Sequence, residues 1–144
     1  MKFKLPVSVL VVIHTLELEV LLLERAQRPG FWQSVTGSLD WPREPLAAAA
    51  AREVREETGI DVAGGRLASW NAANTFEIYL QWRSRFGPGV THNTEHVFGL
   101  ALARRVAVNI APAEHVAFAW LPWQEAAQKC FSWSNRDAIR MLAE

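Results

Sequence analysis

Three glutamates, spaced for one face of a helix, are the residues of this chain best suited to chemistry. Glu53, Glu56 and Glu57 stand at i, i+3 and i+4, a spacing that makes helical side chains neighbours. Like charges repel there, and the dipole near a helix C-terminus also disfavours anions. A divalent cation would compensate both effects, and all-oxygen ligands favour Mg²⁺ or Mn²⁺ over zinc. A solvated, charge-rich surface is the alternative, because Arg52 and Arg55 lie beside them.

The segment that carries these glutamates is predicted to be helical from Pro45 to Thr58. Proline suits the first turn of a helix, since its φ is preset and its missing N–H costs nothing there. The run Leu46–Ala51 consists of strong helix formers, and Gly59 is a natural stop at the C-terminus.

The stretch around this helix resembles the signature of the Nudix hydrolases. Glu44, a gap of seven residues and the run Arg52–Ile60 all match that signature. Six residues rather than the usual five separate Gly37 from Glu44, so the loop Ser38–Arg43 is one residue longer than in the signature. The sequence therefore leaves the path of this loop and the placement of Glu44 open. The resemblance implies a layered Nudix fold and metal-dependent hydrolysis of a phosphoanhydride.

Blocks outside the signature are similar to one branch of this family, the bacterial pyrophosphatases of dihydroneopterin triphosphate in folate biosynthesis. These blocks are Pro6–Ile13, Phe31–Ser38, Pro88–Thr91, Asn93–Glu95 and Ser132–Arg136. The resemblance implies Mg²⁺-dependent hydrolysis to dihydroneopterin monophosphate and pyrophosphate. One alternative is a housecleaning enzyme for (deoxy)nucleoside triphosphates. Another is a binding module without catalysis, and the intact glutamates argue against this second alternative.

The resemblance also implies roles for individual residues. Glu53, Glu57 and Glu114 are the expected metal ligands, and the backbone oxygen of Gly37 is expected to face the same ion. Either Glu56 or Glu114 would take the proton from the attacking water.

The implied substrate contacts are Lys4, Arg25, Thr36, Phe76, Glu77, Ile78, Tyr79 and Ser132. Solvated charges, core packing and turn chemistry are the alternatives for these residues. Arg52 is expected to pair with a neighbouring glutamate, and the histidines are expected to be structural: His92, His96 and His115. Among seven tryptophans, Trp32 or Trp133 is expected to line a flat ring, with Glu77 accepting from the ring edge.

Length and composition narrow the class of protein further. The chain has 144 residues, no net charge and one cysteine, which predicts a single domain over residues 1–144 without a disulfide or a multi-cysteine zinc site. No basic, aromatic-rich stripe indicates nucleic-acid binding, and the apolar N-terminal stretch is too short to span a membrane. We expect a cytoplasmic enzyme with a small-molecule triphosphate substrate, and no protein partner is evident.

Hydrophobic periodicity and turn residues predict a mixed sheet with helices on both sides, an αβα sandwich. Strands are expected at Val7–Ile13, Val20–Arg25, within Phe31–Thr36, and at Thr75–Trp82, His96–Ala103 and Val116–Leu121. Loops are expected at Asp61–Leu67 and Phe86–Thr94. Two further helices are expected, Trp123–Lys129 and Asn135–Leu142, the second capped by Ser134.

Overall fold

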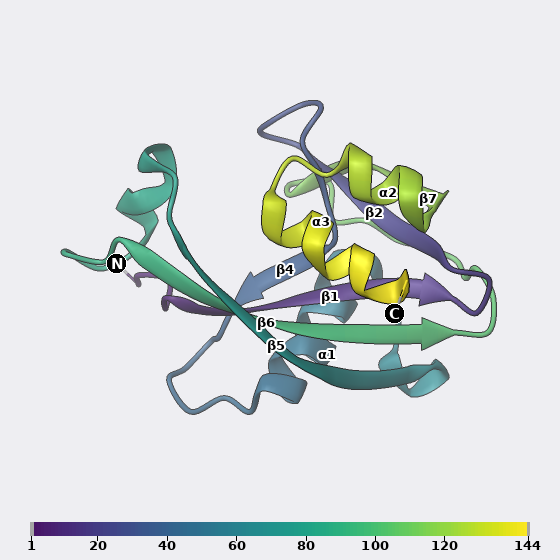
Figure 1. Ribbon diagram of the computed structural model, residues 1–144. Coiled ribbons are helices and arrows are strands. Elements are labelled where there is room, and N and C mark those ends of the chain that lie inside the picture. The colour runs from purple at the N-terminus through teal and green to yellow at the C-terminus, as the bar shows by residue number, and fades with distance from the viewer. Residues whose placement is uncertain (1, 144) are drawn as a thin grey trace.

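One mixed sheet organises the computed structural model, which describes residues 2–143 (Figure 1). Its strands are β1 (Val7–Thr15), β2 (Glu19–Arg25), β3 (Trp32–Gln33), β4 (Val35–Ser38), β5 (Arg66–Glu77), β6 (His92–Leu102) and β7 (His115–Pro122). The order is β3-β2-β1-β6-β5, with β4 paired to β1 and β7 paired to β2. The β1–β6 pair is parallel and the other pairs are antiparallel. The predicted mixed sheet is confirmed.

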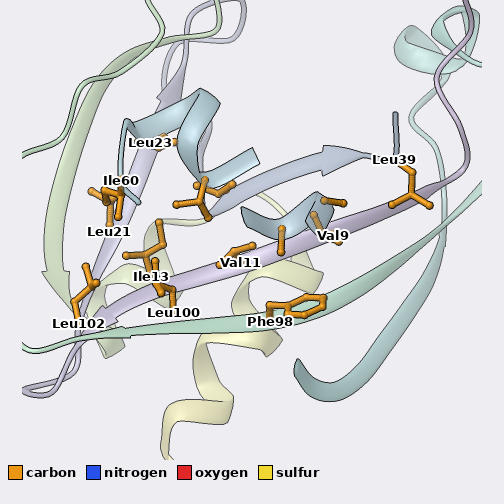
Figure 2. Packing of buried hydrophobic residues seen from close by; sticks show 14 residues of the cluster. Val9, Val11, Ile13, Leu21, Leu23, Leu39, Ile60, Phe98, Leu100 and Leu102 are labelled. Atoms are coloured by element: carbon orange, nitrogen blue, oxygen red, sulfur yellow. The ribbon is translucent and has the colours of Figure 1, made fainter. Parts of the chain in front are cut away.

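Helices cover both faces of this sheet because its central strands are apolar on both sides. Helix α1 (Leu46–Thr58) packs on one face, while α2 (Trp123–Lys129) and α3 (Trp133–Arg140) pack on the other. Successive strand residues point to opposite faces, so Val9 and Val11 of β1 join the α1 side (Figure 2), whereas Leu10 and Val12 join the α3 side. The αβα sandwich is therefore confirmed.

Helix α1 begins and ends where its flanking residues predict. Pro45 precedes its first residue, and Gly59 follows the last one with a φ of 74°, donating its N–H to the Arg55 carbonyl at 2.9 Å. The face turned to the sheet carries Ala49, Ala50 and Val54, together with three polar residues: Glu53, Glu57 and Thr58. Two of the signature glutamates are consequently buried.

The predicted strand Thr75–Trp82 is wrong at both ends. Strand β5 runs from Arg66 to Glu77, and a 3-10 turn follows at Leu80–Arg85, where the Leu80 side chain is 77% exposed. A register shift between Ser69 and Ala72, with Asn71 at a φ of 54°, interrupts the alternation early in the strand. Because a bulge changes which side chains share a face, the pattern of β5 is hidden in its first half.

Three other predicted boundaries also need correction. The loop predicted at Asp61–Leu67 is a 3-10 turn, Val62–Gly64, followed by the start of β5. Strand β6 begins at His92, inside the loop predicted at Phe86–Thr94. Helix α3 is capped by Ser132 rather than Ser134, since the Ser132 hydroxyl accepts from the Asn135 N–H at 3.3 Å. Within residues 2–143, no helix is long and apolar enough to cross a bilayer.

The left-handed residue that ends α1 gives a first testable prediction. Gly59→Ala should lower the free energy of unfolding by about 1–2 kcal/mol, because a Cβ is unfavourable in this conformation; it would also approach the Asn109 side chain at 3.3 Å. The matched control is Gly64→Ala, where the added methyl meets nothing within 4 Å. Chemical denaturation of both variants measures the difference, and equal stabilities would contradict the proposed role of Gly59.

Candidate active site

A cleft of about 990 Å³ brings together the predicted metal ligands, proton acceptors and substrate contacts. These residues are Lys4, Arg25, Thr36, Glu53, Glu56, Glu57, Phe76, Glu77, Ile78, Tyr79, Glu114 and Ser132. They come from the sheet, α1, the start of α3 and the loops between them. All of these residues line the cleft, and the role of each one stays a prediction.

Two buried carboxyls of α1 form the centre of the acidic part of the cleft. Glu57 is 2% exposed and Glu53 is 9% exposed. Burial raises the pKa of Glu57 well above its usual range, and the neighbouring carboxyl of Glu53 adds to the effect. The pKa of Glu53 is also raised by burial, against the influence of Glu57 and Arg52. Among residues 2–143, the Oε1 atom of Glu57 has no hydrogen-bond partner.

The start of β7 adds two further groups beside Glu57. Ligand atoms of Glu57, Glu114 and His115 lie within 4.8 Å of one another, and His115 Nε2 is 3.9 Å from Glu57 Oε1. Burial, and to a smaller extent Arg25, lowers the pKa of His115 to about 4, so its imidazole is neutral at pH 7. His115 was expected to be a structural histidine, and only its position next to Glu114 linked it to the site.

This arrangement of donors fits a hard divalent cation. Carboxylate oxygens converge from α1 and from the start of β7, and one of them is buried without a partner. Buried carboxylates that lack a counter-charge are costly, and oxygen-rich sites suit Mg²⁺ and Mn²⁺. A neutral imidazole is compatible with such an ion as well.

Gly37 permits the close approach of α1 to β4 at this point. A Cβ built on Gly37 would coincide with the carboxylate of Glu53. Any side chain at residue 37 would therefore displace Glu53 from the acidic cluster. The need for glycine here is one of space, since its backbone lies in a regular strand.

Arg52 holds two glutamates of this region, Glu44 and Glu53, in place. Its Nε and Nη2 donate to the two carboxylate oxygens of Glu44, both at 3.0 Å, and its Nη1 donates to Glu53 at 2.7 Å. This confirms that Arg52 pairs with neighbouring glutamates. The bonds from Arg52 lower the pKa of Glu44, and the glutamates raise that of Arg52.

The longer loop before α1 does not displace Glu44. The Glu44 N–H donates to the Trp41 carbonyl at 3.1 Å in a turn, and Glu44 is 5% exposed while Trp41 is 50% exposed. The loop Ser38–Arg43 therefore leaves Glu44 buried, with the Trp41 side chain half exposed.

Cationic side chains line another part of the cleft, among them Lys4, Arg25 and Arg85. The guanidinium of Arg25 lies over the Trp82 ring at 4.7 Å, and among residues 2–143 its Nε has no partner. Burial lowers the pKa of Arg25 and of Lys4, and Arg85 is the next contributor for both. Mutually repelling cations of this kind suit a polyanion. Arg85 was not predicted, because the 3-10 turn that brings it to Lys4 lies where a strand was expected.

Aromatic rings form an apolar wall of the cleft. The Phe76 and Trp133 rings meet edge to face with centroids 6.4 Å apart, and Trp133 is 44% exposed. Trp32 instead lies under Lys129, outside the cleft lining, so Trp133 is the better candidate to face a flat ring. The Glu77 carboxylate is 69% exposed and pairs with Arg83 at 3.2 Å.

Beneath the aromatic wall lies a polar floor, made of Ser8, Asn93, Glu95 and Ser134, all of which are buried and line the cleft. Asn93 Nδ2 donates to the Ser8 hydroxyl at 2.7 Å. Burial raises the pKa of Glu95 to about 7. Sequence reasoning singled out the block Asn93–Glu95 but assigned these side chains no role.

Comparison with known proteins now decides the family. The NUDIX domain profile matches residues 4–142. The chain belongs to the Nudix family. It is 46% identical to the dihydroneopterin triphosphate diphosphatase of Escherichia coli K12, over 97% of this chain and 93% of that protein. The Haemophilus influenzae diphosphatase of the same name is 34% identical, over 97% of this chain and 89% of that one.

A solved structure gives the same result in three dimensions. The structure of the E. coli dihydroneopterin triphosphate pyrophosphohydrolase superimposes with a TM-score of 0.90 at 44% identity, covering 98% of this chain and 97% of that one. Nudix hydrolases act on small phosphate compounds and generally use a divalent metal ion. The acidic cluster of this chain is a candidate site for such an ion.

The Arg52–Glu44 contact gives a second prediction. Arg52→Met should lower the free energy of unfolding by about 3 kcal/mol, because it leaves the Glu44 charge buried and unpaired. Adding Glu44→Gln should recover part of that loss, which a double-mutant cycle in chemical denaturation measures. Arg55→Met, on the exposed face of α1, is the control and should stay within about 0.5 kcal/mol. Additive effects of the two substitutions would contradict the coupling.

Proposed function

We propose that this Nudix enzyme hydrolyses 7,8-dihydroneopterin triphosphate to dihydroneopterin monophosphate and pyrophosphate, a step of folate biosynthesis. The observation that carries the proposal is the cleft itself. An acidic cluster, a group of cations and an aromatic wall with a buried polar floor line one cavity, in a chain 46% identical to an E. coli enzyme of that name. A triphosphate joined to a flat, polar ring needs all of these parts.

The acidic cluster would hold the metal ion. Glu53, Glu57 and Glu114 are the proposed ligands of Mg²⁺, for which Mn²⁺ can substitute. When bound, such an ion neutralises charge on phosphate oxygens and acidifies a bound water. Glu114 and Glu56 are exposed, and one of them would accept the proton of the attacking water.

The cations would position the phosphate chain. Lys4 and Arg25 provide fixed positive charge, which stabilises negative charge as it develops on phosphate oxygens. Arg25 is held over Trp82, so its direction is set before substrate arrives. The hydroxyls of Thr36 and Ser132 line the same cleft and would donate to phosphate oxygens. Water is consumed, one phosphoanhydride P–O bond breaks, and pyrophosphate leaves.

We further propose that residues 1–144 act as one Nudix domain in the cytoplasm. The only cysteine, Cys130, is buried and unpaired, and burial raises the pKa of its thiol to about 12. A chain whose one cysteine forms no disulfide is compatible with a reducing compartment.

The metal assignment predicts the behaviour of a single variant. Glu57→Gln should lower kcat by about 10²-fold or more in saturating Mg²⁺ and leave the fold intact. It should slightly raise the stability of the metal-free protein, because removing one charge relieves repulsion of about 0.2–0.5 kcal/mol per pair. Steady-state kinetics and thermal melts measure both effects, with Glu125→Gln on α2 as the control. Near-normal turnover by the Glu57 variant would refute the assignment.

The substrate assignment predicts the outcome of a comparison. Dihydroneopterin triphosphate should give the highest kcat/KM in a panel with dATP, dGTP, 8-oxo-dGTP and a dinucleoside polyphosphate, and pyrophosphate should appear in one step. Chromatography resolves the products. A nucleotide that exceeds the pterin tenfold, or stepwise release of single phosphates, would replace this proposal with a housecleaning role.

A further inference from the structure

The face of the sheet under α3 changes from apolar to polar at the cleft. Along β6 the residues on this face are Val97, then Glu95, then Asn93, and along β1 they are Leu10 and then Ser8. The two strands are neighbours, and Ser8 pairs with Glu95 in their register. Both strands therefore make the same change at the same level. Core packing alone would favour apolar side chains at these buried positions.

Two acceptors in this polar floor lack donors. Glu95 is 4% exposed and Asn93 is 6% exposed. Among residues 2–143, Glu95 Oε1 and Asn93 Oδ1 have no hydrogen-bond partner. Buried polar atoms are nearly always hydrogen-bonded, and a local rule broken without compensation is expected at functional sites. The floor is short of donors, which a ligand can provide.

The Asn135 side chain of α3 is already hydrogen-bonded outside the polar floor. Asn135 Nδ2 donates to the Ser132 hydroxyl at 2.8 Å, and Asn135 Oδ1 accepts from the Ser34 N–H at 2.8 Å. A hydrogen bond from Ser134 lowers the pKa of Glu95, but burial raises it by more. The net result is a pKa of about 7 for Glu95. Two N–H donors from a ligand would favour the ionised carboxylate again.

We propose that Glu95 and Asn93 recognise the ring of the substrate by its amino-pyrimidinone edge. The carboxylate of Glu95 accepts from the ring N–H and from the adjacent amino group, a pair of parallel donors that matches its two oxygens. Asn93 Oδ1 accepts a further amino N–H, while the ring lies beside Phe76 and Trp133. This inference deepens the proposed function and rests on it for the identity of the substrate.

The geometry separates Glu95 from the acidic residue expected to read the ring. Glu77 is 69% exposed at its side chain and is already paired with Arg83. A solvated, paired carboxylate gains little from two more donors, whereas a buried and unpaired one gains much. We therefore assign the specificity to Glu95.

Guanine presents the same pair of donors as the pterin, and adenine presents a ring acceptor in place of the ring N–H. The test consequently measures kcat/KM for dGTP, dATP and dihydroneopterin triphosphate in the wild type and in Glu95→Gln. The glutamine amide places an N–H against a ring donor. We expect kcat/KM to fall at least about 10²-fold for the pterin and for dGTP, mainly through KM. The value for dATP should stay within a few-fold, so that the preference for dGTP over dATP disappears.

A second readout does not involve catalysis. Dihydroneopterin without phosphates is titrated into the protein in EDTA, with fluorescence as the readout. It should bind to the wild type, and its affinity for Glu95→Gln should be at least about tenfold lower. Glu24→Gln is the control, since Glu24 is partly buried outside the cleft. Thermal melts verify that the variants are folded.

The outcomes separate this inference from the proposed function. An unchanged dGTP to dATP ratio and unchanged dihydroneopterin affinity in Glu95→Gln overturn the inference, even if the pterin is the best substrate. Loss of the ratio in Glu77→Gln instead of Glu95→Gln also overturns it. If the wild type fails to prefer the pterin but its guanine preference depends on Glu95, the proposed function fails and the recognition of the ring edge stands.

Discussion

The burial of negative charge on the sheet-facing side of α1 is the constraint on which the rest of the site depends. Glu53 and Glu57 lie on the same face as Ala49 and Val54, so packing the helix on the sheet forces their carboxyls out of water. Folding alone gains nothing from this, because like charges at this spacing repel. The arrangement is understandable when a divalent cation completes it.

Several features of the chain serve to hold that charge in place. Gly37 leaves room for the Glu53 carboxylate, and Arg52 binds Glu44 and Glu53 together across the start of the helix. The chain reversal at Gly59 ends the helix directly after the last glutamates. Each feature acts locally, and together they orient carboxylates toward the start of β7, where Glu114 and His115 lie.

The strongest sequence signals were local, and these predicted the structure well. Pro45 and Gly59 bound α1, and the apolar runs gave β1 and β2 nearly in full. The bulge near Asn71 hid the first half of β5, since periodicity assumes an uninterrupted strand. After β5 the chain forms a 3-10 turn, although the alternation of apolar and polar residues continues there in the sequence.

Features that depend on distant contacts could not be predicted in this way. His115 lies far beyond Glu57 in the sequence. Their side chains meet only in the folded structure, where the sheet brings them together. In the sequence alone, Glu95 is indistinguishable from an ordinary surface glutamate. In the structure it lies beside Ser8 and under helix α3, and among residues 2–143 its buried Oε1 has no donor. Burial and satisfaction of hydrogen bonds are tertiary properties, and no local pattern reports them.

Direct measurement of ion binding tests the central claim, that the buried carboxyls of α1 form a divalent-cation site. Mn²⁺ is paramagnetic, so electron paramagnetic resonance reports the free ion during a titration of the protein. The wild type should take up Mn²⁺ in a saturable manner, with Mg²⁺ as a competitor, and Glu57→Gln should bind it at least about tenfold more weakly. Equal Mn²⁺ affinity in the two proteins would contradict the account.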